Sequence, residues 1–243
     1  MLGNMLRHLL RQVTKQTETP AVDELPEENL IYQPGIFTVP NMEQAKAIIL
    51  TPEDGMTTEQ RWETETKYLA GAIGDAFELN NNSFVLDYGC GIGRMSKALV
   101  ERYGCSVIGV DISTSMRQLA PGYAANENFL IVSPDILKKL VANGLRFDYC
   151  IAIWVLQHCP NVSCDISLVK SSLKDNGLWY VLNNNASAVP TNKGWINDGV
   201  DIKRLLEHEF TVLNYSRLPT TATTQFVSKH SFVAQLRNDK PNS

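Results

Sequence analysis

Residues 84–99 read FVLDYGCGIGRMSKAL. The stretch opens as a short apolar run, which is typical of a buried strand, and then turns through three glycines at alternate positions, Gly89, Gly91 and Gly93. It continues with apolar residues at helical spacing. Because glycine has no Cβ and adopts positive φ without strain, such a turn lets the backbone approach a ligand closely. The stretch predicts a strand, a turn and a helix around a nucleotide-like ligand; a tight turn without a ligand is the alternative.

The spacing of the glycines separates the possible ligands. A dinucleotide fingerprint needs G-x-G-x-x-G, and Arg94 stands where its last glycine belongs. A phosphate-binding loop needs Gly-Lys-Ser/Thr, which does not occur in this stretch. Asp87 lies inside the turn instead. An acid is a poor neighbour for a pyrophosphate and a good one for a cation.

This Asp-x-Gly-x-Gly-x-Gly pattern resembles motif I of the class I S-adenosylmethionine-dependent methyltransferases, whose cofactor carries an ammonium and a sulfonium and no phosphate. The resemblance covers roughly residues 57–236 and is strongest over 84–158. It implies an α/β fold with a seven-stranded, mostly parallel, doubly wound sheet, here with an N-terminal helical extension. It also implies S-adenosyl-L-methionine as the cofactor, with Asp87 and the three glycines of the turn among its contacts.

A second strand is predicted at residues 105–111, CSVIGVD, and ends in an acid. Asp111 follows Asp87 by 24 residues, which suits one strand–helix–strand unit. A carboxylate at that position can accept hydrogen bonds from the 2′ and 3′ hydroxyls of a ribose. We therefore expect Asp111 and the adjoining Ile112 at the cofactor site.

Strands are also predicted at residues 129–132 and 147–156. In the family, an acid after the third strand reaches the adenine amino group, and the next backbone N–H meets the ring. Asp135 and Ile136 match that pattern, although Asp135 also suits the N-cap of a helix over 136–145. Ile153, in the fourth strand, completes the cofactor contacts that the resemblance implies on the sheet.

The fourth strand runs into Gln157-His158-Cys159-Pro160. Family members that act on nucleobase or glutamine nitrogens carry Asn/Asp-Pro-Pro-aromatic there, so this chain resembles the small-molecule branch. The Cys159-Pro160 order is the reverse of the Pro-Cys of cytosine-C5 enzymes, which argues against a nucleophilic cysteine. His158 is the candidate general base; the alternative is that it supports the pocket wall.

A helix is predicted from Thr57 or Thr58 to Phe77, because Thr57 and Gln60 form a capping-box pattern. The family packs such a helix over the methionine end of the cofactor, which makes Arg61, Trp62 and Glu65 pocket candidates. Trp62, Trp154 and Trp195 are aromatic candidates for contact with a sulfonium, and packing is the alternative for each. The polar loop over 183–195 follows a predicted strand at 177–182, and strands at 210–215 and 231–236 complete the sheet.

Three parts are expected along the chain: an arm over residues 1–55, the methyltransferase domain over 56–237, and a flexible tail over 238–243. In the arm, residues 1–19 have an amphipathic helical pattern and residues 42–50 a second one. The first helix suits docking on the domain or on a second subunit, which would give a homodimer. A transit peptide or a membrane-surface helix is the alternative.

The chain has 243 residues and a formal net charge of −4, so nothing points to nucleic acid as a partner, and no apolar run is long enough to span a membrane. Five scattered cysteines favour reduced thiols in the cytoplasm over disulfides or zinc. The predicted function is methyl transfer to a small-molecule oxygen or nitrogen. The alternatives are a non-catalytic activator subunit and, disfavoured by Asp87 and Arg94, a nicotinamide oxidoreductase.

Overall fold

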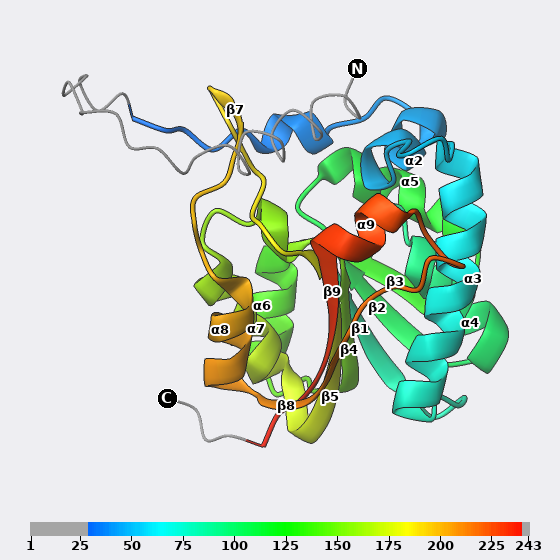
Figure 1. The fold of residues 1–243 in the computed structure, drawn as a ribbon. Coiled ribbons are helices and arrows are strands. Elements are labelled where there is room, and N and C mark those ends of the chain that lie inside the picture. Colours follow the sequence, from blue (N-terminus) through cyan, green and yellow to red (C-terminus); the bar gives the residue numbers. More distant parts are fainter. Residues whose placement is uncertain (1–28, 240–243) are drawn as a thin grey trace.

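The structure is a computed structural model that describes residues 29–239, so the helix predicted over residues 1–19 lies outside the described residues. A seven-stranded sheet lies between two layers of helices (Figure 1). Its strand order is β3-β2-β1-β4-β5-β9-β8, and β9 is antiparallel to both of its neighbours. The mostly parallel, doubly wound sheet is therefore confirmed.

The strands of this sheet are β1 (Phe84–Tyr88), β2 (Ser106–Val110), β3 (Phe129–Val132), β4 (Phe147–Ile153), β5 (Leu173–Asn184), β8 (Thr211–Ser216) and β9 (Ser231–Arg237). A separate hairpin pairs β6 (Val189–Thr191) with β7 (Gly194–Ile196). The helices are α2 (Met42–Ile49), α3 (Thr58–Phe77), α4 (Arg94–Tyr103), α5 (Thr114–Ala124), α6 (Pro134–Ala142), α7 (Val162–Ser172), α8 (Ile202–Glu209) and α9 (Gln225–His230), with short 3-10 turns η1 (Pro34–Phe37) and η2 (Leu156–His158).

The two faces of the sheet bury different clusters of side chains. Apolar residues of α6, α7 and α8 pack on one face, among them Leu137, Ile166 and Leu206. Residues of α3 and α4, such as Ile73 and Leu99, pack on the other face. Figure 1 shows these helix groups on opposite sides of the strands. Burial of both faces explains why the parallel strands read as nearly continuous apolar runs.

The predicted capping box at the start of α3 is confirmed. The Thr57 hydroxyl accepts the Gln60 N–H at 3.2 Å, and the Gln60 side chain accepts the Thr57 N–H at 2.8 Å. These two bonds satisfy donors that a helix N-terminus otherwise leaves unpaired. The local sequence therefore fixes where this helix begins.

Three segments differ from the expectation. The fourth strand ends at Ile153, before the predicted limit at residue 156, because Trp154 adopts a left-handed φ of 64° and η2 follows. The polar loop over 183–195 folds partly into the β6–β7 hairpin. The ordered chain also extends into the expected tail, since the Asn238 amide is buried and donates to the carbonyls of Lys170, Leu173 and Lys174.

Residues 31–39, which we call the strap, cross the carboxyl ends of the strands. At one end Tyr32 pairs with Thr191 of the hairpin. At the other end the Ser113 hydroxyl donates to the Phe37 carbonyl at 2.8 Å, and the Val39 N–H donates to the Ser115 hydroxyl at 2.9 Å. This part of the predicted arm is thus bound to the domain at both ends.

Within residues 29–239, no helix has the length and apolarity needed to cross a membrane.

Two glycines of α3 provide a test of its packing against α4. A Cβ at Gly74 would overlap the Tyr103 hydroxyl, which donates to the Ala70 carbonyl, whereas a Cβ at Gly71 would meet the flexible end of Arg102 at 3.3 Å. We expect Gly74→Ala to lower the free energy of unfolding by about 1–3 kcal/mol. Gly71→Ala, the matched control, should leave it unchanged or raise it by up to about 1 kcal/mol, because alanine favours helix. Urea unfolding of both variants checks this, and equal effects would contradict it.

Candidate functional site

A cavity of about 340 Å³ opens at the carboxyl ends of β1, β2 and β4, and the strap lies against it. This volume falls within the range of roughly 300–1,000 Å³ that is usual for ligand pockets. Five of the predicted cofactor contacts line it: Gly89, Gly91, Asp111, Ile112 and Ile153. The cavity therefore gathers residues from three separate strand ends into one site.

Two glycines of the turn, Gly89 and Gly91, line this cavity, whereas the third, Gly93, does not. Gly89, Gly91 and Gly93 have φ values of 72°, 57° and 83°, in the region that non-glycine residues rarely adopt. A Cβ at Gly91 would also lie 2.6 Å from the Ile49 Cδ1 atom of α2. The backbone conformation therefore favours glycine at position 91, and a Cβ there would also force the Ile49 side chain to shift.

Asp111 joins the turn to the end of β2. Its Oδ2 accepts the Gly91 N–H and its Oδ1 accepts the Ser113 N–H, each at 2.8 Å. Burial raises the pKa of this carboxyl, while the two backbone bonds lower it. Each carboxylate oxygen can accept more than one hydrogen bond. Asp111 can therefore hold the turn and still accept bonds from a ligand in the cavity.

Asp87 lies behind the turn and does not line the cavity. It is 2% exposed, and its Oδ2 accepts the Ser96 N–H at 3.1 Å and the Ser96 hydroxyl at 2.7 Å. Burial raises its pKa to about 6. The sequence predicts that Asp87 is a neighbour of a cation. In the structure, its carboxylate instead anchors the first turn of α4.

Three further candidates also lie away from the cavity. The Asp135 side chain is 85% exposed and faces Lys138 at 3.7 Å, and Ile136 is 43% exposed. Trp62 is packed inside the protein, where its Nε1–H donates to the Tyr123 hydroxyl and the Arg94 guanidinium stacks on its ring at 5.5 Å. For Trp62 the geometry is that of the packing alternative.

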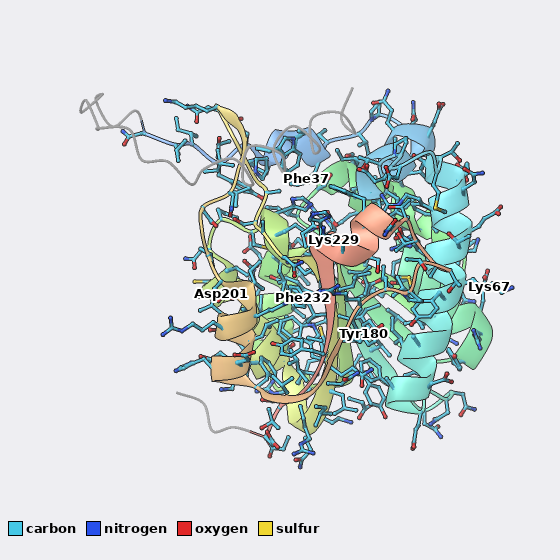
Figure 2. The ribbon with its side chains drawn as sticks, viewed as in Figure 1. Phe37, Lys67, Tyr180, Asp201, Lys229 and Phe232 are labelled. Atoms are coloured by element: carbon cyan, nitrogen blue, oxygen red, sulfur yellow. The ribbon has the colours of Figure 1, made fainter. Side chains whose placement is uncertain are left out.

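A second cavity, of about 90 Å³, adjoins the first and shares with it Phe37, Ile48, Ile49, Trp154 and His158. Its lining also includes Glu53, Arg61, Gln157, Asn184, Trp195, Phe226 and His230. It lies between His158, Trp195 and α3. In Figure 2, Phe37 lies at the end of the molecule where the parallel strands terminate.

Glu65 connects the segments around the smaller cavity. Its carboxylate is fully buried, and its Oε1 accepts bonds from Arg61 Nε at 2.9 Å and from the Thr223 hydroxyl at 2.7 Å. Its Oε2 accepts the Trp154 Nε1–H at 3.3 Å. One side chain of α3 thus fixes the end of β4 and the loop before α9. Of the three pocket candidates on α3, Arg61 lines the smaller cavity and Glu65 supports it.

Trp154 forms the wall between the two cavities. Its left-handed φ of 64° is unusual for a bulky residue and costs on the order of 1–3 kcal/mol. The conformation is held by the Glu65 bond and by the Trp154 N–H, which donates to the Leu182 carbonyl at 2.8 Å. Strain of this kind is concentrated at functional sites.

His158 lines both cavities and has a defined tautomer. Its Nδ1 lies 2.8 Å from the Ala188 carbonyl oxygen, which can only accept, so Nδ1 carries the proton. Its Nε2 therefore accepts a hydrogen bond from the Gln157 side-chain amide at 3.2 Å. Burial lowers the pKa of this imidazole to about 4. Phe37 and Trp195 pack against the ring, with centroids 5.7 and 5.1 Å away. His158 is therefore neutral near pH 7.

Several residues of the site carry no signal in the sequence. Phe37 lines the cavities and Thr223 bonds to Glu65 through contacts between segments that are distant along the chain, and no motif marks either one. Asp165 also lines the larger cavity, where it bonds to Tyr88. In the sequence, the hint of the Tyr88–Asp165 pair is the position of Tyr88 within the glycine motif, between Asp87 and Gly89.

A family model described as a methyltransferase domain matches residues 58–238. The chain belongs to the methyltransferase domain family. Membership confirms the resemblance seen in the glycine turn and, with it, S-adenosylmethionine as the implied cofactor. Since the matched region begins at the start of α3 and ends after β9, it includes all seven strands of the main sheet.

Two curated relatives match parts of the chain. A ubiquinone biosynthesis O-methyltransferase from Bartonella tribocorum is 31% identical over 102 residues, which are 42% of this chain and 41% of that protein. A sterol 4-C-methyltransferase from Caenorhabditis elegans is 29% identical over 126 residues, which are 50% of this chain and 37% of that protein. The chain thus spans about two fifths of the length of the relatives it matches.

Solved structures share the fold at low identity. The CurJ carbon methyltransferase superposes with a TM-score of 0.59 at 14% identity, covering 82% of this chain and 59% of that one. A magnesium protoporphyrin IX methyltransferase from Synechocystis superposes with a TM-score of 0.52 at 19% identity, covering 74% of this chain and 84% of that one. Both support the fold class.

The raised pKa of Asp87 predicts a pH dependence of stability. Since burial raises it from 3.8 to about 6, the native state binds this proton more tightly than the unfolded state does. The resulting stabilisation is complete below about pH 4 and is lost as the pH rises through 6, for a total of about 3 kcal/mol. We expect the unfolding free energy of the wild type, minus that of Asp87→Asn, to fall by most of this amount between pH 4.5 and 7. Denaturant titrations measure it, and a rise over that interval would contradict the assignment.

Proposed function

We propose that this chain transfers a methyl group from S-adenosylmethionine to an oxygen or nitrogen of a small molecule held in the smaller cavity. The observation that carries the proposal is the junction of the two cavities at Trp154 and His158. The larger cavity has the glycine turn and Asp111, and the smaller one has polar side chains and aromatic walls. A donor site and an acceptor site would thus meet at a shared wall.

The residues of the larger cavity fit the cofactor. The turn has no Cβ atoms at Gly89 or Gly91, so the backbone can approach the ligand, and the Asp111 carboxylate can accept from ribose hydroxyls. When bound, the cofactor supplies a methyl group on a positively charged sulfur, which is an excellent leaving group. The residues of this chain then have to bind, orient and exclude water.

The smaller cavity suits an acceptor that is not an anion. Its lining includes the acidic side chain of Glu53, which is 4% exposed. Arg61, the arginine of this lining, is already bonded to Glu65 and to the Thr51 carbonyl. An acceptor with a hydroxyl or an amine therefore suits these groups better than an anion.

The size of this cavity constrains the acceptor further. At about 90 Å³ it is smaller than the cavity of roughly 150 Å³ that is known to hold benzene. The aromatic side chains around it, Phe37, Trp154, Trp195 and Phe226, would exclude water from the reacting group. The part of the substrate that enters is therefore expected to be smaller than a six-membered aromatic ring.

Cofactor binding is the first test. Calorimetry should show that S-adenosylmethionine and S-adenosylhomocysteine bind with micromolar affinity and that NAD does not. Asp111→Ala should weaken S-adenosylhomocysteine binding by about 2–4 kcal/mol, because the ribose hydroxyls lose a charged acceptor in a buried site. Asp135→Ala, which changes an acid outside the cavity, is the matched control and should bind like the wild type. NAD binding, with no response to either sulfur compound, would overturn the proposal.

His158 should act by supporting the wall of the site, through its bonds to Ala188 and Gln157, rather than by removing a proton. With its pKa lowered to about 4, the imidazole is a weak base at neutral pH. Once a radiolabelled screen has identified an acceptor, His158→Asn should lower turnover by less than about tenfold and leave cofactor affinity unchanged. The pH–rate profile of the wild type should show no inflection near 6.5 that the variant lacks. Such an inflection, with a loss of a hundredfold or more, would restore the general-base role.

A further inference from the structure

The larger cavity has a polar end that the glycine turn and Asp111 do not explain. This end is formed by Tyr32 of the strap, Tyr88 at the end of β1, and Cys159, Cys164 and Asp165 from η2 and α7. Asp165 is the carboxylate among them, and it is partly buried. A carboxylate that lines a ligand cavity is a candidate for recognising a donor on the ligand.

Asp165 is held in place by Tyr88. The Tyr88 hydroxyl donates to its Oδ1 at 2.5 Å, and burial together with the Asp165 charge raises the pKa of that phenol, so it keeps its proton. The Cys159 thiol donates to the Val155 carbonyl at 3.7 Å. Because a carboxylate offers about four acceptor positions, the bond from Tyr88 leaves capacity for a donor from a ligand.

Asp135, which by the family resemblance would reach the adenine amino group, does not line the cavity. Asp135 is exposed and faces Lys138, and the Ile136 N–H points to the Ser133 hydroxyl at 3.4 Å. Pro134 lines the cavity in their place and has no N–H to donate. An amino group of a ligand in this cavity therefore cannot use Asp135, the expected partner. Asp165, which lines the same cavity, is available instead.

We propose that Asp165, oriented by Tyr88, accepts the exocyclic amino group of the purine and selects adenine in this chain. The inference rests on the proposed function, because it assumes that an adenosyl compound occupies the larger cavity. The sheet supplies the geometry: Tyr88 follows Asp87 in β1, so alternation turns its side chain to the opposite face, toward α7, where Asp165 lies. Tyr88 thus links the glycine motif to the selecting carboxylate.

The test compares two ligands that differ only at the amino group, S-adenosylhomocysteine and its analogue with unsubstituted purine in place of adenine. Calorimetry on the wild type should show that the adenine compound binds about ten- to a hundredfold more tightly, as expected for a hydrogen bond to a charged acceptor. In Asp165→Ala the preference should fall to within threefold. Asp135→Ala, the matched control, should keep the full preference.

Asp165→Asn serves as the test if the alanine variant fails to fold, because asparagine still accepts from Tyr88 but has lost the charge. The preference of this variant for the adenine compound should be at least fivefold lower than that of the wild type. Equal affinity of the two ligands for the wild type would overturn the inference, and so would a preference that persists in the Asp165 variants or disappears in Asp135→Ala. These results leave the proposed function standing, since S-adenosylhomocysteine still binds. If the wild type binds neither ligand, the proposed function fails as well.

Discussion

The arrangement of both cavities depends on one buried carboxylate, Glu65. It accepts hydrogen bonds from α3, from the end of β4 and from the loop before α9, and no part of it is exposed. A buried charge is costly unless it is paired and fully bonded, and removing its partners typically costs about 3–5 kcal/mol. The three segments therefore keep their relative positions, because moving any of them would leave this carboxylate poorly satisfied.

This constraint extends from the protein interior to the wall of the site. Trp154 would relax toward an ordinary backbone conformation if its indole N–H had no partner, and the wall between the two cavities would move with it. On the opposite side the strap closes the same region, with Phe37 packed against His158 and Trp195. One wall is thus held by a buried ion pair and the other by aromatic contacts and two serine hydroxyls.

The parts that sequence could predict are those set by local patterns. The α3 capping box, the glycine turn and the acid after β2 each depend on a few neighbouring residues, and each is present in the structure. The direction of a side chain at the end of a strand is harder to predict, because it depends on strand parity and on what the next layer offers. Asp87 faces Ser96 of α4, whereas Tyr88, one residue later, faces Asp165 of α7. Thr223 and Phe37 depend on distant contacts, so no local pattern identifies them.

The site favours alignment over acid–base chemistry as the source of rate. Holding two reactants in a productive geometry can supply about 7–11 kcal/mol, whereas a general base supplies roughly 10²–10⁴-fold, or about 3–5 kcal/mol. The histidine nearest the junction has its pKa lowered to about 4 by burial, which weakens it further as a base. The same burial excludes water, and the ring is fixed between the Ala188 carbonyl and the Gln157 side chain, so it can form a rigid wall against a substrate. The surroundings that make His158 a poor base therefore make it a good positioning group, as a reaction limited by alignment requires.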